Sequence, residues 1–410
     1  MDALPANPSD FERVEDAGAA LAFEAKIAFL RRLAEAASPD RTTAYETHMS
    51  WVFMVGDRAF KLKKPVRLPY LDFTTLQRRE AACRAELRLN RRLAPDVYLD
   101  VAPLRLGPGG LSIGGEGRTV DWLVRMRRLD DAQCLAARLH NHVRDGELDQ
   151  IALALIGFYR RATRVRVTPR AHLSFWSRAL DDDRRVLLDR RFDLPRGWIR
   201  WIDRVLHRFL EANADRLAER VRRRRILDAH GDLRPEHIFL GDGVRIIDCL
   251  EFSAELRAND PADEIAFLDL ECERLGAPEA GSRIRRKVLR ALGEADPEPL
   301  YSFYRCHRAM LRARLSIAHL FDPHVRSPDE WPARARRYLA LAAADAARLE
   351  PGLRLIGKEV AQRAVMVQPS DSLSQQRAAG QDVELGPQPV VAEAECGHGV
   401  GDRDPRERRI

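Results

Sequence analysis

The sequence lacks the features that mark membrane and secreted proteins. No apolar run approaches the roughly 20 residues needed to cross a bilayer. Residues 1–18 are acidic and contain no apolar signal core. The six cysteines are scattered, and no Cys-x-x-Cys pair occurs among them. These absences predict a cytoplasmic protein with reduced, mostly buried thiols and no membrane partner.

Neither sign of charge is in large excess. The chain has 69 basic and 62 acidic residues, and its formal net charge is +7. This balance suits an anionic ligand such as ATP but does not by itself indicate nucleic acid. The longest basic run, 222–225, has no aromatic residues among its arginines. We expect it to form the solvated end of a helix, so nucleic acid is not a favoured partner.

The most informative stretch is 226–252, where two short apolar runs enclose two carboxylates. The turn Gly241-Asp242-Gly243 between the runs predicts a β-hairpin that brings Asp248 back beside Asp232. One carboxylate can then bind a divalent cation while the other accepts a proton from a hydroxyl, as phosphoryl transfer requires. The alternative is a surface hairpin with turn aspartates, and for Asp242 we adopt that interpretation.

This stretch resembles the catalytic and metal-binding loops of the aminoglycoside phosphotransferase family. Residues 230–237 read His-Gly-Asp-Leu-Arg-Pro-Glu-His, and Ile-Asp follows at 247–248, as in a less characterised bacterial branch of the family. The resemblance implies an α+β, protein-kinase-like fold with a small antiparallel-sheet N-lobe and a larger helical C-lobe. It also implies ATP and Mg²⁺ as cofactors, Asp232 as catalytic base and Asp248 as a metal ligand.

One position departs from the family pattern, because His237 stands where the family has a metal-binding Asn. Imidazole is a softer ligand than an amide oxygen, and Mg²⁺ prefers oxygen. Three interpretations stay open: His237 acts on the metal through a water, it accepts another metal, or the activity is lost.

Two strands, 51–55 and 59–63, are predicted around the turn at 56–57. In the second strand Ala59, Lys61 and Lys63 share one face, and the intervening apolar residues share the other. The Ala-x-Lys spacing is that of the kinase strand whose lysine binds the nucleotide phosphates, which favours Lys61 over Lys63. The alternative is a lysine-rich edge strand that resists aggregation.

A long helix is predicted over 74–93, with Thr74 or Thr75 as its N-cap. Kinase-like folds need a glutamate on this helix to pair with the strand lysine. The resemblance assigns this role to Glu86, while Glu80 is expected to lie on the solvated face.

The sequence has no glycine-rich phosphate loop before the first of these strands. Thr47 and Ser50 stand in its place and are candidates for binding phosphate oxygens. Further strands over 97–104 and 121–126 would complete the sheet. The family fold makes the second of them the hinge strand, so Met126 is a candidate for adenine contact through its backbone.

The remainder of the chain is predicted to be mostly helical. Helices are expected over 20–36, 132–144, 148–163, 172–188, 198–220, 261–276, 283–292, 298–320 and 329–349. The acidic run 181–183 suits a cationic substrate, but a helix cap or a position in solvent is favoured. Asp260 is the expected N-cap of its helix, and the family resemblance implies that Asp263 braces the catalytic loop; the alternative is that Asp263 only stabilises the positive end of the helix. One of Arg305, Arg308, Arg312 and Arg314 could reach substrate or phosphate.

These patterns predict four segments: an N-terminal helical extension (1–40), the N-lobe (41–128), the C-lobe (129–367) and a disordered tail (368–410). A near P-loop over 352–359 fails because Glu359 replaces the metal-binding Ser or Thr. The expected function is ATP-dependent transfer of phosphate to a small-molecule hydroxyl. The alternatives are a nucleotide-binding pseudokinase and, less favoured, a basic nucleic-acid binder.

Overall fold

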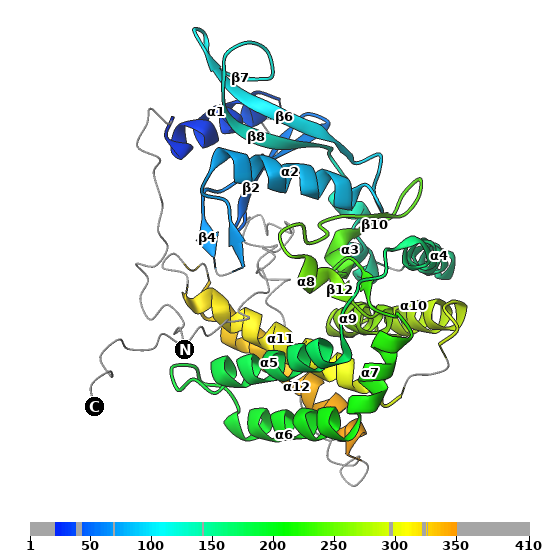
Figure 1. Cartoon of the computed structure of the whole chain (residues 1–410). Coiled ribbons are helices and arrows are strands. Elements are labelled where there is room, and N and C mark those ends of the chain that lie inside the picture. Colours follow the sequence, from blue (N-terminus) through cyan, green and yellow to red (C-terminus); the bar gives the residue numbers. More distant parts are fainter. Residues whose placement is uncertain are drawn as a thin grey trace, which may run out of the picture.

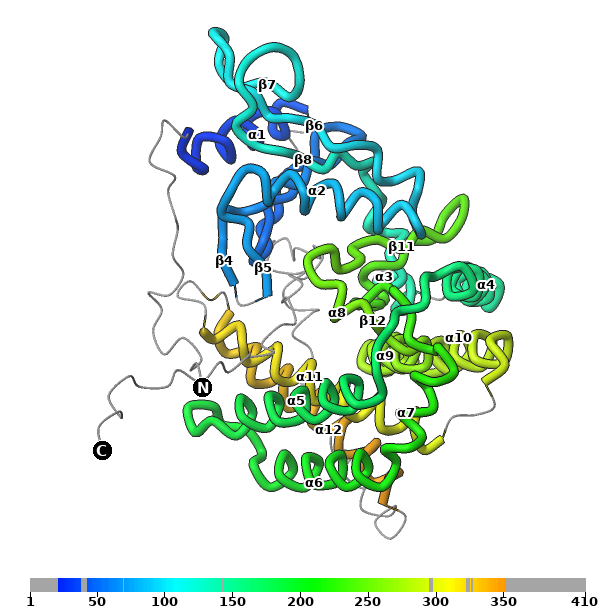
Figure 2. Tube along the Cα trace, in the orientation of Figure 1, coloured from blue at the N-terminus to red at the C-terminus, as the bar shows by residue number. Residues whose placement is uncertain are grey.

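The computed structural model describes residues 21–350, except 38–42, 69, 142, 295–297, 322–324 and 326. Figures 1 and 2 show a sheet lobe lying over a larger helical lobe. The near P-loop, Cys396 and the expected tail lie outside the described residues. In the described part of the chain, no helix is both long and apolar enough to span a membrane.

A six-stranded antiparallel sheet forms the first lobe, in the order β1-β2-β3-β8-β6-β7. Its strands are β1 (Ala44–Glu46), β2 (Ser50–Val55), β3 (Arg58–Lys63), β6 (Tyr98–Gly107), β7 (Gly110–Ile113) and β8 (Arg118–Arg127). A separate pair, β4 (Arg67–Leu68) and β5 (Leu71–Asp72), precedes the helix α2 (Leu76–Asn90). Thr75 caps α2 by accepting a hydrogen bond from the backbone N–H of Arg78.

The two faces of the sheet are covered by different helices. Phe60 and Leu62 of β3 pack with Leu30 of α1 (Phe23–Ala37). Ala59, on the opposite face, packs with Cys83 of α2. The predicted alternation along β3 is therefore confirmed, and it directs Lys61 and Lys63 toward the side of α2.

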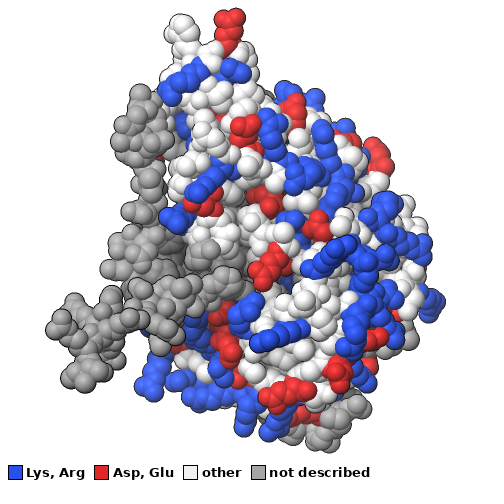
Figure 3. All heavy atoms as spheres, in the orientation of Figure 1, with Lys and Arg blue, Asp and Glu red and all other residues white. Residues whose placement is uncertain are grey.

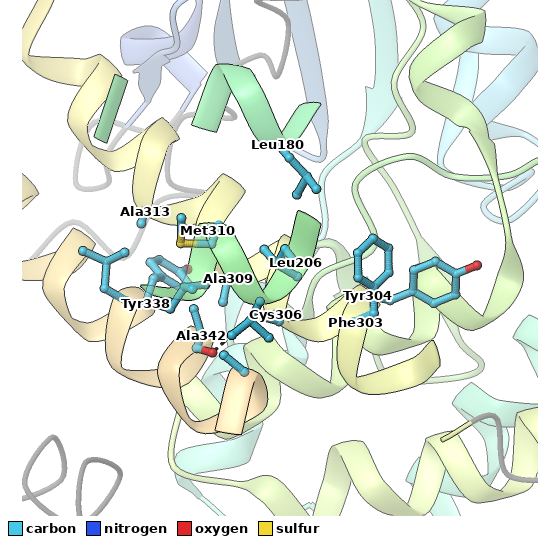
Figure 4. Packing of buried hydrophobic residues seen from close by; sticks show 14 of the residues in the cluster. Leu180, Leu206, Phe303, Tyr304, Cys306, Ala309, Met310, Ala313, Tyr338 and Ala342 are labelled. Atoms are coloured by element: carbon cyan, nitrogen blue, oxygen red, sulfur yellow. Dashed lines mark hydrogen bonds between the residues drawn. The ribbon is translucent and has the colours of Figure 1, made fainter. Parts of the chain in front are cut away.

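The second lobe is mainly helical. Its helices are α3 (Leu135–His140), α4 (Asp145–Arg161), α5 (Pro169–Leu187), α6 (Arg196–Ala212), α7 (Ala214–Arg222), α8 (Ala254–Arg257), α9 (Pro261–Arg274), α10 (Pro278–Ala291), α11 (Leu300–Ala318) and α12 (Glu330–Leu349). Its core joins α5, α6, α9, α11 and α12 around residues such as Phe303, Tyr304 and Tyr338. Figure 4 shows these rings packed with Leu206 and Met310.

The α+β, two-lobe fold expected from the sequence, with a small antiparallel sheet and a larger helical lobe, is confirmed by this sheet and these helices. Two helix predictions were wrong in detail. The segment expected as 132–144 is a short turn (Asp131–Gln133) followed by α3, and the helix expected over 198–220 is split at Asn213 into α6 and α7.

The described cysteines are free thiols. Cys83, Cys249, Cys272 and Cys306 are buried, and Cys134 is half-buried. Burial raises the pKa of Cys83 and of Cys249 to about 12. These thiols therefore behave as small core residues, as expected from their scattered positions.

Candidate active site

The loop 229–237 is fixed at both of its ends. Before it, β9 (Leu227–Asp228) pairs with β12 (Ala258–Asn259). After it, β10 (Ile238–Phe239) pairs with β11 (Arg245–Ile246), which confirms the predicted hairpin in a short form. Gly231 has φ +89, and a Cβ there would lie 2.8 Å from Leu250 Cδ1, so this position requires glycine.

The loop backbone is braced by Glu264 of α9. The N–H groups of His230 and Gly231 donate to Glu264 Oε1 over 2.9 and 2.6 Å, and the Tyr159 hydroxyl donates to Oε2 over 2.9 Å. Burial raises the pKa of Glu264, against the effect of these donors.

The prediction that Asp263 braces the loop was therefore wrong. Asp263 forms a bidentate pair with Arg308 at 2.9 and 2.7 Å. Adjacent helical residues point about 100° apart, and spacing in the sequence did not show which of the two acids faces the loop.

Asp232 lies in the loop with only 1% of its surface exposed. The Arg234 guanidinium donates to Asp232 Oδ2 over 3.1 Å and lies 3.0 Å from Oδ1. Burial would raise the pKa of Asp232, but Arg234 and Arg312 together hold that pKa below its ordinary value. The carboxyl group is therefore an ionised acceptor at neutral pH.

His237 lies between the two candidate carboxylates. Its Nδ1 is 2.9 Å from the Asp232 carbonyl oxygen, and Arg234 Nη2 lies 3.0 Å from its Nε2. Since a guanidinium only donates, Nε2 is the acceptor and Nδ1 carries the proton. His237 Nδ1 is 3.6 Å from Asp232 Oδ2, and its Nε2 is 3.7 Å from Asp248 Oδ2. Both carboxylates thus approach one imidazole ring.

Asp248 follows β11 in a left-handed backbone conformation, with φ +64. A non-glycine residue at positive φ is uncommon and is often found at functional sites. Its backbone N–H donates to the Tyr98 hydroxyl over 3.2 Å. Its carboxylate accepts a hydrogen bond from Lys61 Nζ over 2.8 Å. Burial would raise the pKa of Asp248, but Lys61 holds it below its ordinary value.

Glu86 of α2 pairs with both candidate lysines. Its Oε1 lies 2.9 Å from Lys61 Nζ, and its Oε2 lies 2.7 Å from Lys63 Nζ. Lys63 also contacts Glu251, which follows the loop carrying Asp248. The Lys63 side chain is 1% exposed and that of Lys61 is 14% exposed. Lys61 is therefore the more accessible ammonium, and Lys63 is the more deeply buried one.

The other candidate nucleotide contacts are engaged within the sheet lobe. The Thr47 hydroxyl accepts the Ser50 N–H over 3.0 Å, and the Thr47 N–H donates to the Ser50 carbonyl over 2.8 Å. Met126 lies on β8, which is paired on both sides with β3 and β6. Phosphate contact by Thr47 or Ser50, and adenine contact by Met126, therefore stay predictions.

The acidic run 181–183 does not form a joint cationic-ligand site. Asp181 pairs with Arg184 at 2.8 Å and Asp182 pairs with Arg185 at 2.6 Å, while Asp183 is buried 2.8 Å from Arg314. On the face shown in Figure 3, basic and acidic side chains are interspersed over both lobes.

Three residues of the site were missed by sequence reasoning: Arg234, Glu251 and Glu264. Arg234 was visible inside the recognised motif, but its burial was not. Glu251 and Glu264 gave no signal, because their partners depend on how segments far apart in the sequence meet.

Comparisons with known proteins give relatives of modest similarity. No protein-family model matches the sequence. An uncharacterized protein of Mycobacterium tuberculosis is 34% identical over 316 residues, which make up 76% of this chain and 61% of the relative. An uncharacterized protein of Mycobacterium bovis matches with the same values. The chain thus spans about three-fifths of the length of these curated relatives.

Several solved kinase structures align with a large part of the chain at low TM-scores. A choline/ethanolamine kinase family protein from Mesorhizobium loti aligns with a TM-score of 0.47 at 16% identity, over 81% of this chain and 99% of that one. A choline kinase from Cryptosporidium parvum gives 0.47 at 12% identity, over 82% and 99%. The GDP complex of aminoglycoside 2'-phosphotransferase-IIIa gives 0.44 at 17% identity, over 78% and 98%. At these values the similarity carries no argument about substrate or mechanism.

Proposed function

We propose that this protein is an ATP-dependent phosphotransferase that moves the γ-phosphate to a hydroxyl of a small molecule. One observation carries the proposal. Asp232 and Asp248 both approach His237, and Asp248 is joined across the lobes to Lys61 at 2.8 Å. A carboxylate pair facing a lysine ammonium is the arrangement that phosphoryl transfer uses to orient a hydroxyl and to neutralise phosphate charge.

Each side chain has a definite role in this proposal. Lys61, held by Glu86, binds phosphate oxygens. Asp232 accepts the proton of the acceptor hydroxyl, and its lowered pKa keeps it ionised for that step. Lys63 fixes the position of Glu86 from the buried side rather than contacting the nucleotide.

The residues fit a Mg²⁺ ion carried in by the nucleotide. In the described part of the chain, no group of three or more His, Cys, Asp and Glu side chains is arranged to hold a metal ion alone. Mg²⁺ commonly uses one or two carboxylates together with substrate phosphates and waters. Asp248 is the carboxylate that would hold it, with His237 beside it. The ion would neutralise charge on the phosphates.

A pseudokinase remains the second candidate function, because of Arg234. Its guanidinium donates hydrogen bonds both to the Asp232 carboxylate and to the Nε2 atom of His237. If that contact persists with nucleotide bound, Asp232 has less freedom to accept a proton. We also propose that the protein is cytoplasmic, that its partner is a small molecule and that it does not bind nucleic acid.

The test compares Asp232→Asn with Asp242→Asn, a change in the exposed turn of the β10–β11 hairpin that follows the loop. Binding of Mg²⁺·AMP-PNP is followed by thermal shift, and turnover by ADP release over a panel of hydroxyl compounds. Asp232→Asn should lower turnover by about 10²-fold or more and keep nucleotide binding. Asp242→Asn should change neither. Nucleotide binding by the wild type without turnover of any acceptor would favour the pseudokinase.

A further inference from the structure

The segment 246–250, which carries Asp248, is attached to both lobes by its backbone N–H groups. Two of these groups, at Ile247 and Leu250, donate to carbonyl oxygens of the loop 229–237 over 3.0 and 3.1 Å. The other three donate to acceptors that belong to the sheet lobe. Asp248 therefore lies on the seam between the lobes, and both lobes fix its position.

Two of the acceptors in the sheet lobe are side chains, one at the end of α2 and one at the start of β6. The Tyr98 hydroxyl accepts the Asp248 N–H over 3.2 Å, and the Oδ1 atom of Asn90 accepts the Cys249 N–H over 2.9 Å. Tyr98 and Asn90 are each 1% exposed. Little water can replace an acceptor removed from such a buried position, so the N–H group that it served would be left unsatisfied.

These two hydrogen bonds act on the peptide groups at either side of the Asp248 Cα atom. The φ of Asp248 is +64, in the left-handed region, where a residue with a Cβ atom is strained. A strained conformation persists only where the surrounding structure holds it. The N–H of Asp248 belongs to the preceding peptide group and the N–H of Cys249 to the following one, so anchoring both restricts φ and ψ together.

Asn90 also connects Asp248 to the lysine of the same site. The Nδ2 atom of Asn90 donates to the Glu86 carbonyl oxygen over 3.0 Å, one turn earlier on α2. The Glu86 carboxylate pairs with Lys61 at 2.9 Å, and Lys61 lies 2.8 Å from the Asp248 carboxylate. One helix therefore sets the position of the ammonium group and, through Asn90, the backbone that carries the facing carboxylate.

We propose that Tyr98 and Asn90 are positioning residues, which hold Asp248 in the backbone conformation that aims its carboxylate at the Mg²⁺ ion of the nucleotide. The inference rests on the proposed function and makes the sheet lobe responsible for the geometry of the metal ligand. Neither side chain is assigned a contact with the nucleotide or the ion, because both act through the backbone at Asp248. Their loss should weaken the metal-dependent part of nucleotide binding and spare the part that Lys61 supplies.

The first experiment compares Tyr98→Phe with Tyr301→Phe, each of which removes one buried hydroxyl group and keeps the ring. The Tyr301 hydroxyl donates to Asp269 over 2.8 Å in the core of the helical lobe, so this variant is the matched control. The affinity for a fluorescent AMP-PNP analogue is measured in Mg²⁺ and in EDTA. Tyr98→Phe should weaken binding by about 10-fold in Mg²⁺, as expected for an unsatisfied N–H group, and leave it unchanged in EDTA. Tyr301→Phe should match the wild type in both media, even where it lowers the free energy of unfolding.

A double-mutant cycle with Asp248→Asn tests whether Tyr98 acts through Asp248. Asparagine tolerates the left-handed conformation and removes the charge, so this variant should lose most of the difference between Mg²⁺ and EDTA. In that background Tyr98→Phe should have little further effect. Hydrogen exchange gives a measurement that needs no nucleotide: the amides of 246–250 should exchange about 5-fold faster or more in Tyr98→Phe and in Asn90→Ala, and at the wild-type rate in Tyr301→Phe. Tyr98→Phe decides the inference if Asn90→Ala does not fold.

Four results would overturn the inference and leave the proposed function intact. They are wild-type affinity of Tyr98→Phe in Mg²⁺, an equal loss of its affinity in Mg²⁺ and in EDTA, the same loss in the Asp248→Asn background as in the wild type, and unchanged amide exchange over 246–250. A wild type that does not bind AMP-PNP, or that binds it equally with and without Mg²⁺, would instead overturn the proposed function and the inference with it.

Discussion

Lys63→Met should destabilise the protein far more than the same change at the neighbouring Lys64. Lys63 is 1% exposed, and its ammonium lies between Glu86, at 2.7 Å, and Glu251. Glu86 is fully buried. Methionine keeps the apolar stem but removes the charge, so two buried carboxylates lose a counter-ion. Breaking a buried pair in this way costs about 3–5 kcal/mol of the free energy of unfolding.

Lys64 provides a matched control one residue away. Its ammonium pairs with Glu46 at 2.7 Å, but the two side chains are 18% and 33% exposed. A solvated pair of this kind contributes about 0–1 kcal/mol. The free energies come from urea titrations followed by circular dichroism, in which a changed midpoint at constant slope reports stability. Equal destabilisation by the two substitutions would refute the argument from burial.

The same variants separate the roles of Lys61 and Lys63, which the sequence left open. Lys61→Met should lose Mg²⁺·AMP-PNP affinity with a smaller loss of stability, because Lys61 is the more exposed of the two. Lys63→Met should keep nucleotide binding in the folded fraction. Loss of nucleotide binding in Lys63→Met, with binding retained in Lys61→Met, would reverse the proposed assignment.

Three further predictions test the packing around the site. Glu264→Ala should cost on the order of 3 kcal/mol in urea titrations, because it leaves two buried loop N–H groups without an acceptor. Gly281→Ala should lower the free energy of unfolding by about 1–3 kcal/mol, since the new Cβ would lie 2.8 Å from the Cα of Asp269. Gly146→Ala should raise it by about 0.5–1 kcal/mol, because no atom lies within 4 Å of the new Cβ. Burial and two neighbouring arginines lower the pKa of His307 well below 6.5. Below about pH 6.5 the unfolded chain therefore takes up a proton that the folded chain does not, so the free energy of unfolding decreases as the pH is lowered. His307→Gln should remove up to about 1.4 kcal/mol of that decrease per pH unit between pH 6.5 and 5.5.

Local patterns in the sequence predicted what depends on nearby residues. The alternation along β3 followed from the two-residue period of a strand, and it is confirmed by the separate packing of Ala59 and Phe60. Asp260 accepts the Ala262 N–H as the expected N-cap of α9. The break at Asn213 was missed because no proline or glycine marks it and the apolar pattern continues on both sides.

Partners at long range could not be predicted in the same way. Lys63 and Glu251 are 188 residues apart, and nothing in either local sequence identifies the other. The prediction that Asp263, rather than Glu264, braces the loop was wrong for the same reason. Both acids open one helix, and only the packing of α9 against the loop decides which of them meets the two N–H groups.

Among the described residues, the side of the site around β3 carries an excess of negative charge, and this bears on how a phosphoryl group would be placed. Around β3, the carboxylates of Glu86, Asp248 and Glu251 outnumber the ammonium groups of Lys61 and Lys63. That excess favours a divalent cation near Asp248. Asp232 lies on the other side of His237 and is held by the Arg234 guanidinium. A metal-bound nucleotide would be attracted to the side of β3, where Lys61 meets Asp248, and Asp232 lies beside that side, across His237.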